Sequence, residues 1–183
     1  MNIIDKIISP YLNNKFLYIG EKVTISEHMI QTAMLAEKAN CSDNLICSSL
    51  LHDYGHFIIK SPDDLVNKEK DGKHEDLGFE FLNKYFIKDV VGPIKNHVKA
   101  KKYLARNKKY YDTLSKASKI SLKLQGGMIN NNEAKEFENN EFFESSIKLR
   151  KFDEGAKKVG LKIKSINENK NLLAAKLIWI LIT

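Results

Sequence analysis

Apolar residues recur at helical spacing along almost the whole chain, and this pattern limits what the chain can fold into more than any other feature. Ile3, Ile7 and Ile8 lie on one face of a helix, and the i, i+3, i+4 spacing returns at Ile30–Met34 and at Leu77–Tyr85. No alternating apolar and polar run stands out to predict a strand. We therefore expect an all-α protein with about seven or eight helices.

Helix boundary signals fall where the apolar pattern begins and ends. Thr24 and Glu27 have the spacing of a capping box, and Ser42 precedes the next helical run. Pro93 suits the first turn of a helix, whereas the pair Gly126–Gly127 suits the end of one. The boundary signals and the apolar period therefore agree on a bundle of helices.

Length and composition fit one globular domain. The chain has 183 residues, of which 43% are hydrophobic and 29% charged, and it contains three prolines and no Gly/Ser-rich linker. We expect a single domain over residues 1–183, with a core at about 10–160 and an apolar C-terminal tail at 171–183. The Asn-rich stretch 130–140 predicts a loop that flanks a short polar helix.

Cysteine usage and the apolar segments argue against export and against a membrane span. Cys41 and Cys47 have no second pair with which to form a zinc site or a disulfide framework, so we expect them to be reduced and structural. Asp5 and Pro10 interrupt the apolar N-terminus before a signal-peptide core forms. The apolar run 177–182 is shorter than the roughly 20 residues that span a bilayer, so we interpret it as one side of a final helix or as a terminal strand. The prediction is a cytoplasmic protein without a membrane partner.

The net charge is +7, and its densest cluster is the stretch 99–109, which holds six basic residues and no acidic one. Such a run can be a solvated helix face, a funnel for a phosphate-like anion, or a patch that binds nucleic acid. A solvated face is the commonest of the three. We therefore expect no nucleic-acid partner.

The histidines form the pattern that points to chemistry. All five lie between positions 28 and 97, and His52 is followed directly by Asp53. Adjacent side chains at a helix end point about 100° apart, so one ion can take both, and the second carboxylate oxygen can reach another ion. Gly55 would then let the chain turn away from the site.

Further ligand types surround this pair. His28 and His97 fall inside predicted helices, His74 lies at a helix start, and Asp153 lies on a late helix. Four imidazoles and two carboxylates without a thiolate suit iron, manganese or zinc. The residue types thus predict a metal site but do not choose among these metals.

His28, His52-Asp53 and Asp153 resemble the metal-binding signature of the HD-domain superfamily. Over about residues 10–160 the chain also resembles the phosphonate-degrading, mixed-valent diiron oxygenases of that superfamily, because seven motifs occur in the family's order. The motifs are Tyr18-Ile-Gly-Glu21, Glu27-His28-Met-Ile-Gln31, His52-Asp-Tyr-Gly-His56, His74-Glu-Asp-Leu-Gly78, His97-Val-Lys-Ala-Lys101, Gln125-Gly-Gly127 and Leu149-Arg150-Lys-Phe-Asp153. The resemblance implies a compact, single-domain HD-domain helical bundle.

The resemblance also implies two iron ions, Fe(II) and Fe(III), with O2 as co-substrate. It assigns one iron to His28, His52, Asp53 and Asp153. It assigns the other to His74, His97 and the second oxygen of Asp53.

Substrate-contacting roles follow from the same resemblance. Tyr18 would cap one iron in the empty site, and Glu21 would help to close over the substrate and receive its ammonium group. The positions that would support the ligands or contact the phosphonate are His56, Lys101, Ser118 and Arg150, with Ser115 and Ser121 as alternatives to Ser118.

Helical spacing places two of these residues beside predicted ligands. Lys101 follows His97 by four residues, and Arg150 precedes Asp153 by three, so each pair shares a helix face. Lys101 would act as a point charge and Arg150 as a planar fork toward an anion. Arg150 also has the simpler interpretation of an ion pair with Asp153.

The reaction that the resemblance implies is oxidative cleavage of a carbon–phosphorus bond. The substrate would be 1-hydroxy-2-aminoethylphosphonate or its N-methylated analogue, and the products would be phosphate and glycine or the betaine analogue. An α-ketoglutarate-dependent hydroxylase would act upstream. Oxidation suits this bond because it has no hydrolytic path comparable with that of a phosphate ester.

Three alternatives stay open. An HD phosphohydrolase would cleave a nucleotide or another phosphate ester with a metal-activated water. An oxygenase resembling myo-inositol oxygenase would cleave a C–C bond in a polyol. The third alternative is a protein without catalytic activity, either a scaffold or a nucleic-acid binder. The pair Tyr18 and Glu21, with the motifs at 125–127 and 149–153, favours the phosphonate oxygenase.

Overall fold

The computed structural model describes residues 2–13, 16–18, 21–59 and 73–178. Within these ranges the regular structure is helical, with two isolated β-bridges, Leu17–Thr24 and Phe86–Leu177. The helices are α1 (Ile3–Asn13), α2 (Ile25–Lys38), α3 (Asp43–Leu51), α4 (Gly55–Ile58), α6 (His74–Leu82), α7 (Lys88–Leu104), α8 (Lys108–Thr113), α9 (Lys116–Leu124), α10 (Asn131–Glu138), α11 (Phe143–Gly155), the 3-10 helix η1 (Ile166–Asn169) and α12 (Lys170–Ala174). The all-α expectation is confirmed. The helical segments outnumber the expected seven or eight because elements as short as α4 and α12 span less than two apolar repeats.

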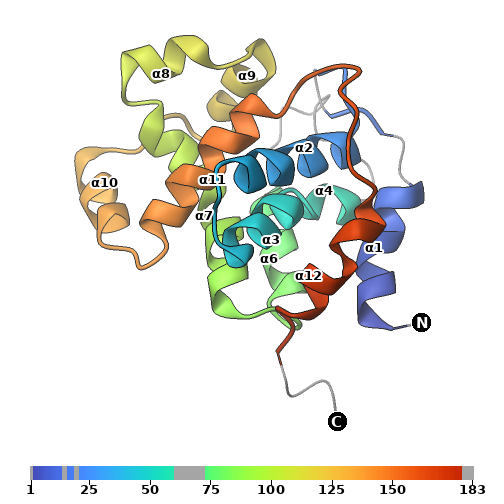
Figure 1. Ribbon diagram of the computed structural model, residues 1–183. Coiled ribbons are helices and arrows are strands. Elements are labelled where there is room, and N and C mark those ends of the chain that lie inside the picture. Colours follow the sequence, from blue (N-terminus) through green and yellow to red (C-terminus); the bar gives the residue numbers. More distant parts are fainter. Residues whose placement is uncertain (1, 14–15, 19–20, 60–72, 179–183) are drawn as a thin grey trace.

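Four helices form the centre of the bundle. α11 packs against α7 and α2, and α3 packs against α2 and α7. Figure 1 shows α8, α9 and α10 on one side of this centre and α1 with α12 on the other, where the chain returns after α11. The main core contains fully buried Met29, Leu50, Leu51 and Ile94 from three of the four central helices. The apolar faces predicted from the sequence therefore meet between these helices.

The predicted helix starts are mostly in place. Thr24 and Glu27 form both halves of the capping box of α2, and Ser42 caps α3 through its side chain. The prediction for Pro93 was wrong, because α7 begins at Lys88 and Pro93 lies inside the helix. The missing proline N–H removes one hydrogen bond there, and burial of Pro93 among apolar residues offsets that loss.

The polar region between α9 and α10 also follows the sequence in part. Gly126 and Gly127 take φ values of +87° and +77° after the end of α9, so the predicted helix end is confirmed. The Asn-rich stretch is more ordered than a loop: α10 fills most of it, with Asn130 as N-cap and Glu133 completing a capping box. Phe137, which is 1% exposed, anchors this helix to the bundle.

The C-terminal tail packs on the bundle by two means. Leu173 of α12 is fully buried, and Leu177 pairs with Phe86 in an isolated bridge, flanked by a hydrogen bond from Ile178 N to Tyr85 O at 2.7 Å. The described part of the apolar run is thus extended rather than helical, and residues 179–183 lie outside the described residues. None of the described helices combines the length and the hydropathy needed to cross a membrane.

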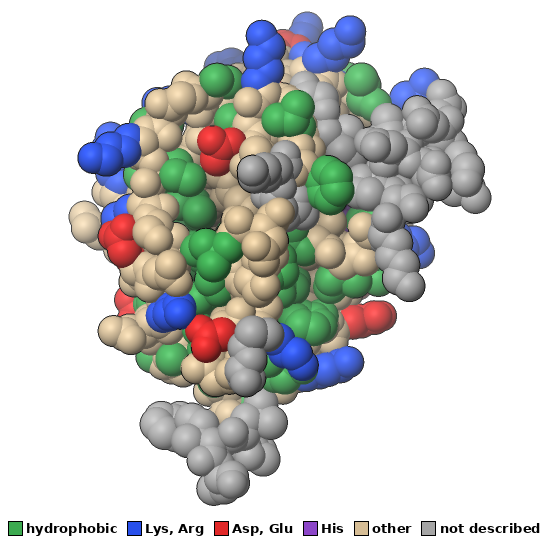
Figure 2. Space-filling view, turned by 90° about the vertical axis from the view of Figure 1, so that its right-hand side faces the viewer, with side chains coloured by type: hydrophobic (Ala, Val, Ile, Leu, Met, Phe, Trp, Pro, Cys, Tyr) green, Lys and Arg blue, Asp and Glu red, His purple; other side chains and the backbone are tan. Residues whose placement is uncertain are grey.

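The basic stretch 99–109 divides between the interior and the surface. Lys101 is 4% exposed, whereas residues 106–109 are exposed, as expected for a solvated face. Lys99 and Lys102 line a surface cavity of about 450 Å³ in which acidic side chains also take part. On the face shown in Figure 2, basic and acidic side chains are interspersed.

Candidate metal centre and its surroundings

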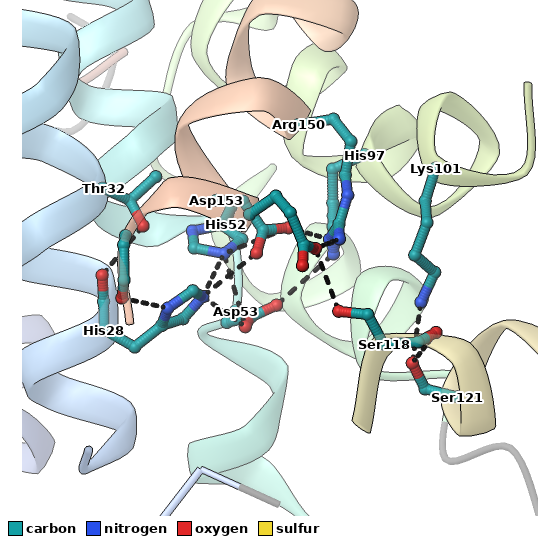
Figure 3. Close-up of polar contacts among 12 residues, drawn as sticks. His28, Thr32, His52, Asp53, His97, Lys101, Ser118, Ser121, Arg150 and Asp153 are labelled. Atoms are coloured by element: carbon teal, nitrogen blue, oxygen red, sulfur yellow. Dashed lines mark hydrogen bonds and ion pairs between the residues drawn. The ribbon is translucent and has the colours of Figure 1, made fainter. Parts of the chain in front are cut away.

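Five segments bring the six predicted ligands to one buried place. Figure 3 shows the side chains of His28, His52, Asp53, His97 and Asp153 pointing toward one another. His28 comes from α2, His52 and Asp53 from the end of α3, His74 from the start of α6, His97 from α7 and Asp153 from α11. None of the six is more than 9% exposed. The structure thus brings together the six side chains that the sequence analysis singled out, while their role as metal ligands stays a prediction.

Asp53 lies between two pairs of histidines and presents one oxygen to each pair. Its Oδ2 lies 3.5 Å from His28 Nε2 and 3.3 Å from His52 Nε2. Its Oδ1 lies 3.3 Å from both His74 Nε2 and His97 Nε2. A carboxylate in this position can bridge two cations.

The remaining carboxylate belongs to one side only. Asp153 Oδ1 lies 3.3 Å from His28 Nε2, so Asp153 joins His28 and His52 in a group whose ligand atoms all lie within 4.8 Å of one another. Asp53, His74 and His97 form a second group by the same measure. This division is the one that the resemblance implied for two metal ions.

Backbone carbonyls fix the orientation of three of the imidazoles. Because a carbonyl oxygen only accepts, each contacting Nδ1 carries a proton, and Nε2 is the nitrogen that faces the centre. The acceptors are Ala156 O for His28 (2.9 Å), Ser49 O for His52 (2.9 Å) and Ile94 O for His97 (2.6 Å). Metal-binding histidines are characteristically held by their second nitrogen in this way.

The donor atoms fit cations better than they fit one another. His28 Nε2 and His52 Nε2 lie 3.2 Å apart, and His74 Nε2 and His97 Nε2 lie 3.0 Å apart, so both nitrogens of each pair are close enough to bind one shared cation. Among the described residues, both oxygens of Asp53 and Oδ1 of Asp153 are buried without a hydrogen bond. A cation between each pair of imidazoles would satisfy all of these atoms.

The electrostatics of these side chains point the same way. Burial disfavours a charged His28, yet the carboxylates of Asp153 and Asp53 raise its pKa to about 9. Burial also disfavours the Asp153 carboxylate, but Arg150 and His28 hold its pKa well below the ordinary range. In the second group burial lowers the pKa of His74 to about 3. The carboxylates thus stay ionised and draw a proton onto His28, and a metal cation could supply the same positive charge in place of that proton.

A family model described as the HD domain matches residues 25–138, which hold five of the six converging side chains. The chain belongs to the HD-domain family. It is 40% identical over 153 residues to the hydroxymethylphosphonate dioxygenase of Gimesia maris, covering 82% of this chain and 76% of the relative. It is 39% identical over 145 residues to the [1-hydroxy-2-(trimethylamino)ethyl]phosphonate dioxygenase (glycine-betaine-forming) of Leisingera caerulea, covering 79% and 74%. An uncharacterised protein of Acanthamoeba polyphaga mimivirus is 38% identical over 160 residues, covering 85% and 73%.

Gln31 ties the first ligand helix of this HD domain to the segment after α11. Its Nε2 donates to Lys158 O at 2.9 Å, and its Oε1 accepts from Lys158 N at 3.0 Å. This pair of bonds holds α2 beside Ala156, whose carbonyl orients His28. The last residue of the motif Glu27–Gln31 therefore has a positioning role.

Tyr18 and His56 cover opposite ends of the ligand set. The Tyr18 ring stacks on His28 with centroids 4.2 Å apart, and the His56 ring stacks on His74 at 4.3 Å. The two covering rings meet edge to face at 6.0 Å. Burial raises the pKa of Tyr18, with Asp53 adding to the effect, so its hydroxyl keeps its proton. Both residues thus lie against predicted ligands, while the roles that the resemblance gave them stay predictions.

The two predicted phosphonate-binding cations differ in what they contact. Lys101 Nζ donates to Ser121 Oγ at 3.0 Å, and Lys101 forms no ion pair with the described carboxylates. The Arg150 guanidinium pairs with both Asp153 and Glu154 and donates to Tyr110 Oη at 3.1 Å. The simpler interpretation of Arg150, an ion pair with Asp153, is therefore realised. The Lys101 amine is therefore not engaged by a carboxylate among the described residues.

Ser118 and Glu21 lie in one polar cluster beyond Arg150. Ser118 Oγ donates to Glu154 Oε2 at 2.9 Å, and Glu21 Oε1 accepts from Ser115 Oγ at 2.7 Å. Glu21 also lies 3.4 Å from Lys157 Nζ. Ser118 therefore contacts a carboxylate rather than a metal ligand, and its assignment to the phosphonate stays a prediction.

Sequence reasoning missed Glu154 and Lys157. Glu154 pairs with Arg150 at i+4 and Lys157 with Glu154 at i+3, so helical charge spacing gave a signal for both. The signal was weak because such pairs are common on solvated helix faces. Here the pairs are nearly buried, with the Glu154 and Lys157 side chains 12% and 11% exposed.

The chain turns at residues 52–54, between the end of α3 and the start of α4 at Gly55. The chain does not turn through a left-handed conformation there, because the positive-φ glycines among the described residues are at 126, 127 and 160. Gly55 instead begins α4, and its missing side chain lets α4 approach α6 closely beside His74.

Proposed function

We propose that this HD-domain protein is a diiron oxygenase that uses O2 to cleave the C–P bond of a small 1-hydroxyphosphonate, releasing phosphate and a carboxylate. The observation that carries the proposal is the position of Asp53, with one oxygen on each histidine pair. A hydrolytic site with a single metal ion would not need a carboxylate shared between two histidine pairs. The names of two relatives about 40% identical support the reaction class.

The converging side chains provide the donors for two iron ions. His28, His52 and Asp153 would hold one, and His74 and His97 the other, with Asp53 shared between them. The iron pair, Fe(II) and Fe(III), would supply the redox capacity that O2 chemistry needs and Lewis acidity toward the substrate hydroxyl and phosphonate oxygens. Nitrogen and oxygen donors without thiolate are compatible with iron in both oxidation states.

The protein's own groups would select and hold the anion. Lys101 lies on α7 one turn after His97, and its ammonium group contacts no carboxylate among the described residues. A phosphonate beside it would supply the charge partner that a buried cation requires. Arg150 would act mainly by fixing Asp153, because its guanidinium is shared between Asp153 and Glu154.

Tyr18 and His56 would control access to the reacting carbon. Each ring stacks on a predicted ligand, His28 and His74 respectively, so together they form an aromatic wall above the two groups. A wall of this kind excludes water from the site, and Tyr18 would have to shift to admit a substrate at its metal. Exclusion of water favours oxidation of the bound substrate over side reactions.

One assay separates this proposal from the hydrolase alternative. Iron-loaded protein is supplied with O2 and, in parallel, hydroxymethylphosphonate, 1-hydroxy-2-aminoethylphosphonate and its trimethylated analogue, and phosphate release and O2 uptake are followed. One O2 consumed per phosphate, with a mixed-valent EPR signal on substrate addition, supports the oxygenase. Phosphatase turnover with Mg(II) or Mn(II), without O2 uptake, supports an HD phosphohydrolase instead. Inositol in the same assay tests for a C–C bond-cleaving oxygenase.

A further inference from the structure

Lys157 lies just beyond α11, and its ammonium group is enclosed by acceptors from three segments. Nζ lies 3.2 Å from Glu154 Oε1 and 3.4 Å from Glu21 Oε1. It also donates to Ser118 Oγ at 2.9 Å and lies 3.3 Å from Ser115 Oγ. An ammonium group has three hydrogens, so these contacts use all of its donors.

The two carboxylates around Lys157 are also satisfied. Glu21 Oε1 accepts from Ser115 Oγ, and Glu154 accepts from Ser118 Oγ, from the backbone N–H of Ser115 and from Arg150. Two acidic side chains, Glu21 and Glu154, thus face two basic ones, Lys157 and Arg150. The cluster is neutral before any ligand enters.

This cluster is connected to the candidate metal centre. Arg150 contacts Asp153 with one nitrogen and Glu154 with another, and Glu154 contacts Lys157, which contacts Glu21. Charges alternate along this series from the ligand outward. The position that the family resemblance gave to a substrate ammonium, beside Glu21, is therefore already filled by an ammonium of the protein.

We propose that Lys157 is the internal counterion of Glu21 and that it makes the enzyme prefer a 1-hydroxyphosphonate without an ammonium group, of which hydroxymethylphosphonate is the smallest. The inference rests on the proposed function and names the substrate class of that site. A substrate ammonium beside Glu21 would lie close to Lys157 as a like charge, or it would have to displace Lys157 from four acceptors. An uncharged substituent meets neither obstacle.

Competition among three phosphonates tests the preference. Dissociation constants for hydroxymethylphosphonate, 1-hydroxy-2-aminoethylphosphonate and its trimethylated analogue are measured by calorimetry on iron-loaded protein without O2, and kcat/KM by phosphate release with O2. The wild-type protein should bind and turn over hydroxymethylphosphonate at least about tenfold better than either cationic compound, given the cost of juxtaposed like charges.

Substitution of Lys157 should abolish most of this preference. Lys157→Ala and Lys157→Gln remove the counterion and leave Glu21 free for a substrate cation. The ratio of the affinity for 1-hydroxy-2-aminoethylphosphonate to the affinity for hydroxymethylphosphonate should therefore rise about tenfold over the wild-type ratio. Lys157→Arg keeps the charge and should keep the wild-type preference. Lys158→Ala is the matched control, because the Lys158 side chain is exposed. This variant should keep the wild-type preference in both the dissociation constants and the kcat/KM values. Circular dichroism and iron content verify that each variant is folded.

The outcomes separate this inference from the proposed function. The role of Lys157 is overturned if the wild-type protein releases phosphate from the cationic compounds at least as efficiently as from hydroxymethylphosphonate. That result would leave the proposed oxygenase function intact. Unchanged affinity ratios in both Lys157→Ala and Lys157→Gln, with normal iron content, also overturn the role of Lys157. If none of the three compounds releases phosphate under O2, the proposed function itself fails and the substrate preference fails with it.

Discussion

Gly55 lies directly against the carbonyl group of His74, so that a Cβ at position 55 would overlap with the His74 carbonyl oxygen and carbon. The same contact continues at Gly78, where an added Cβ would lie 3.1 Å from Gly55 N. Two glycines therefore let α4 and α6 approach backbone to backbone. This approach sets the position of His74, the first residue of α6 and a member of the second ligand group.

Gly55→Ala should consequently remove metal from one group of ligands. The added methyl would push the start of α6 outward and separate His74 from His97 and Asp53 Oδ1, while His28, His52 and Asp153 stay in place. We expect the iron content, measured by elemental analysis, to fall from two ions per chain toward one.

Gly127→Ala is the control for the loss of a glycine. An added Cβ there meets nothing within 4 Å, although its φ of +77° makes the change cost about 1–2 kcal/mol. This variant should lose thermal stability and still bind two ions. Two ions per chain in Gly55→Ala would show that His74 does not depend on the close approach of the two helices.

Substitution of Asp53 should release more metal ions from the protein than substitution of Asp153. Asp53 faces all four histidines, whereas Asp153 lies near His28 and His52 only. We expect Asp53→Ala to lose both irons and Asp153→Ala to lose one, by elemental analysis of protein purified with excess iron. Retention of two irons in Asp53→Ala would refute the shared-ligand assignment.

Part of the evidence for which side chains lie together is local in the sequence, and the family resemblance supplied the rest. His52-Asp53 is a dipeptide, and the helices that carry His28, His74 and His97 are visible from apolar spacing and boundary residues. Those helices then place the side chains by their regular geometry, so a correct helix assignment nearly determines which way each ligand points.

Features that depend on tertiary contacts were not predictable in the same way. The place of Pro93 inside α7 depends on packing around it, since proline is compatible with a helix start and with a buried interior turn. The role of Gly55 depends on contact with α6, a separate helix that begins 19 residues later. The pairing of Lys157 with Glu21 joins residues 136 positions apart in the sequence, and no local pattern reports such a contact.

Thr24→Ala should destabilise the fold through the helix that carries His28. The Thr24 hydroxyl accepts from Glu27 N at 3.1 Å, and the Glu27 carboxylate accepts from Thr24 N at 2.7 Å. Loss of such an N-cap lowers the free energy of unfolding by about 1 kcal/mol. Urea unfolding of metal-free protein measures this change. Thr24→Ser keeps the hydroxyl and should restore most of the stability, whereas equal losses in both variants would argue against capping as the cause.

Lys101 should make phosphonate binding depend on pH near neutrality. Burial, with a contribution from the Arg150 guanidinium, lowers the pKa of Lys101 to about 7. Because only the protonated amine attracts an anion, the dissociation constant for hydroxymethylphosphonate should increase as the pH rises above 7, by up to about tenfold per pH unit. The measurement is calorimetry between pH 6 and 9 on iron-loaded protein without O2.

The ionisation of the phosphonate itself contributes to that profile, and Lys101→Arg separates the two effects. An arginine stays protonated throughout this pH range, so the variant reports the substrate's titration alone. The wild-type protein should therefore lose affinity relative to Lys101→Arg as the pH rises, and Lys101→Met should bind weakly at every pH. Parallel profiles for the wild-type protein and Lys101→Arg would mean that the Lys101 ammonium is not the group that holds the phosphonate.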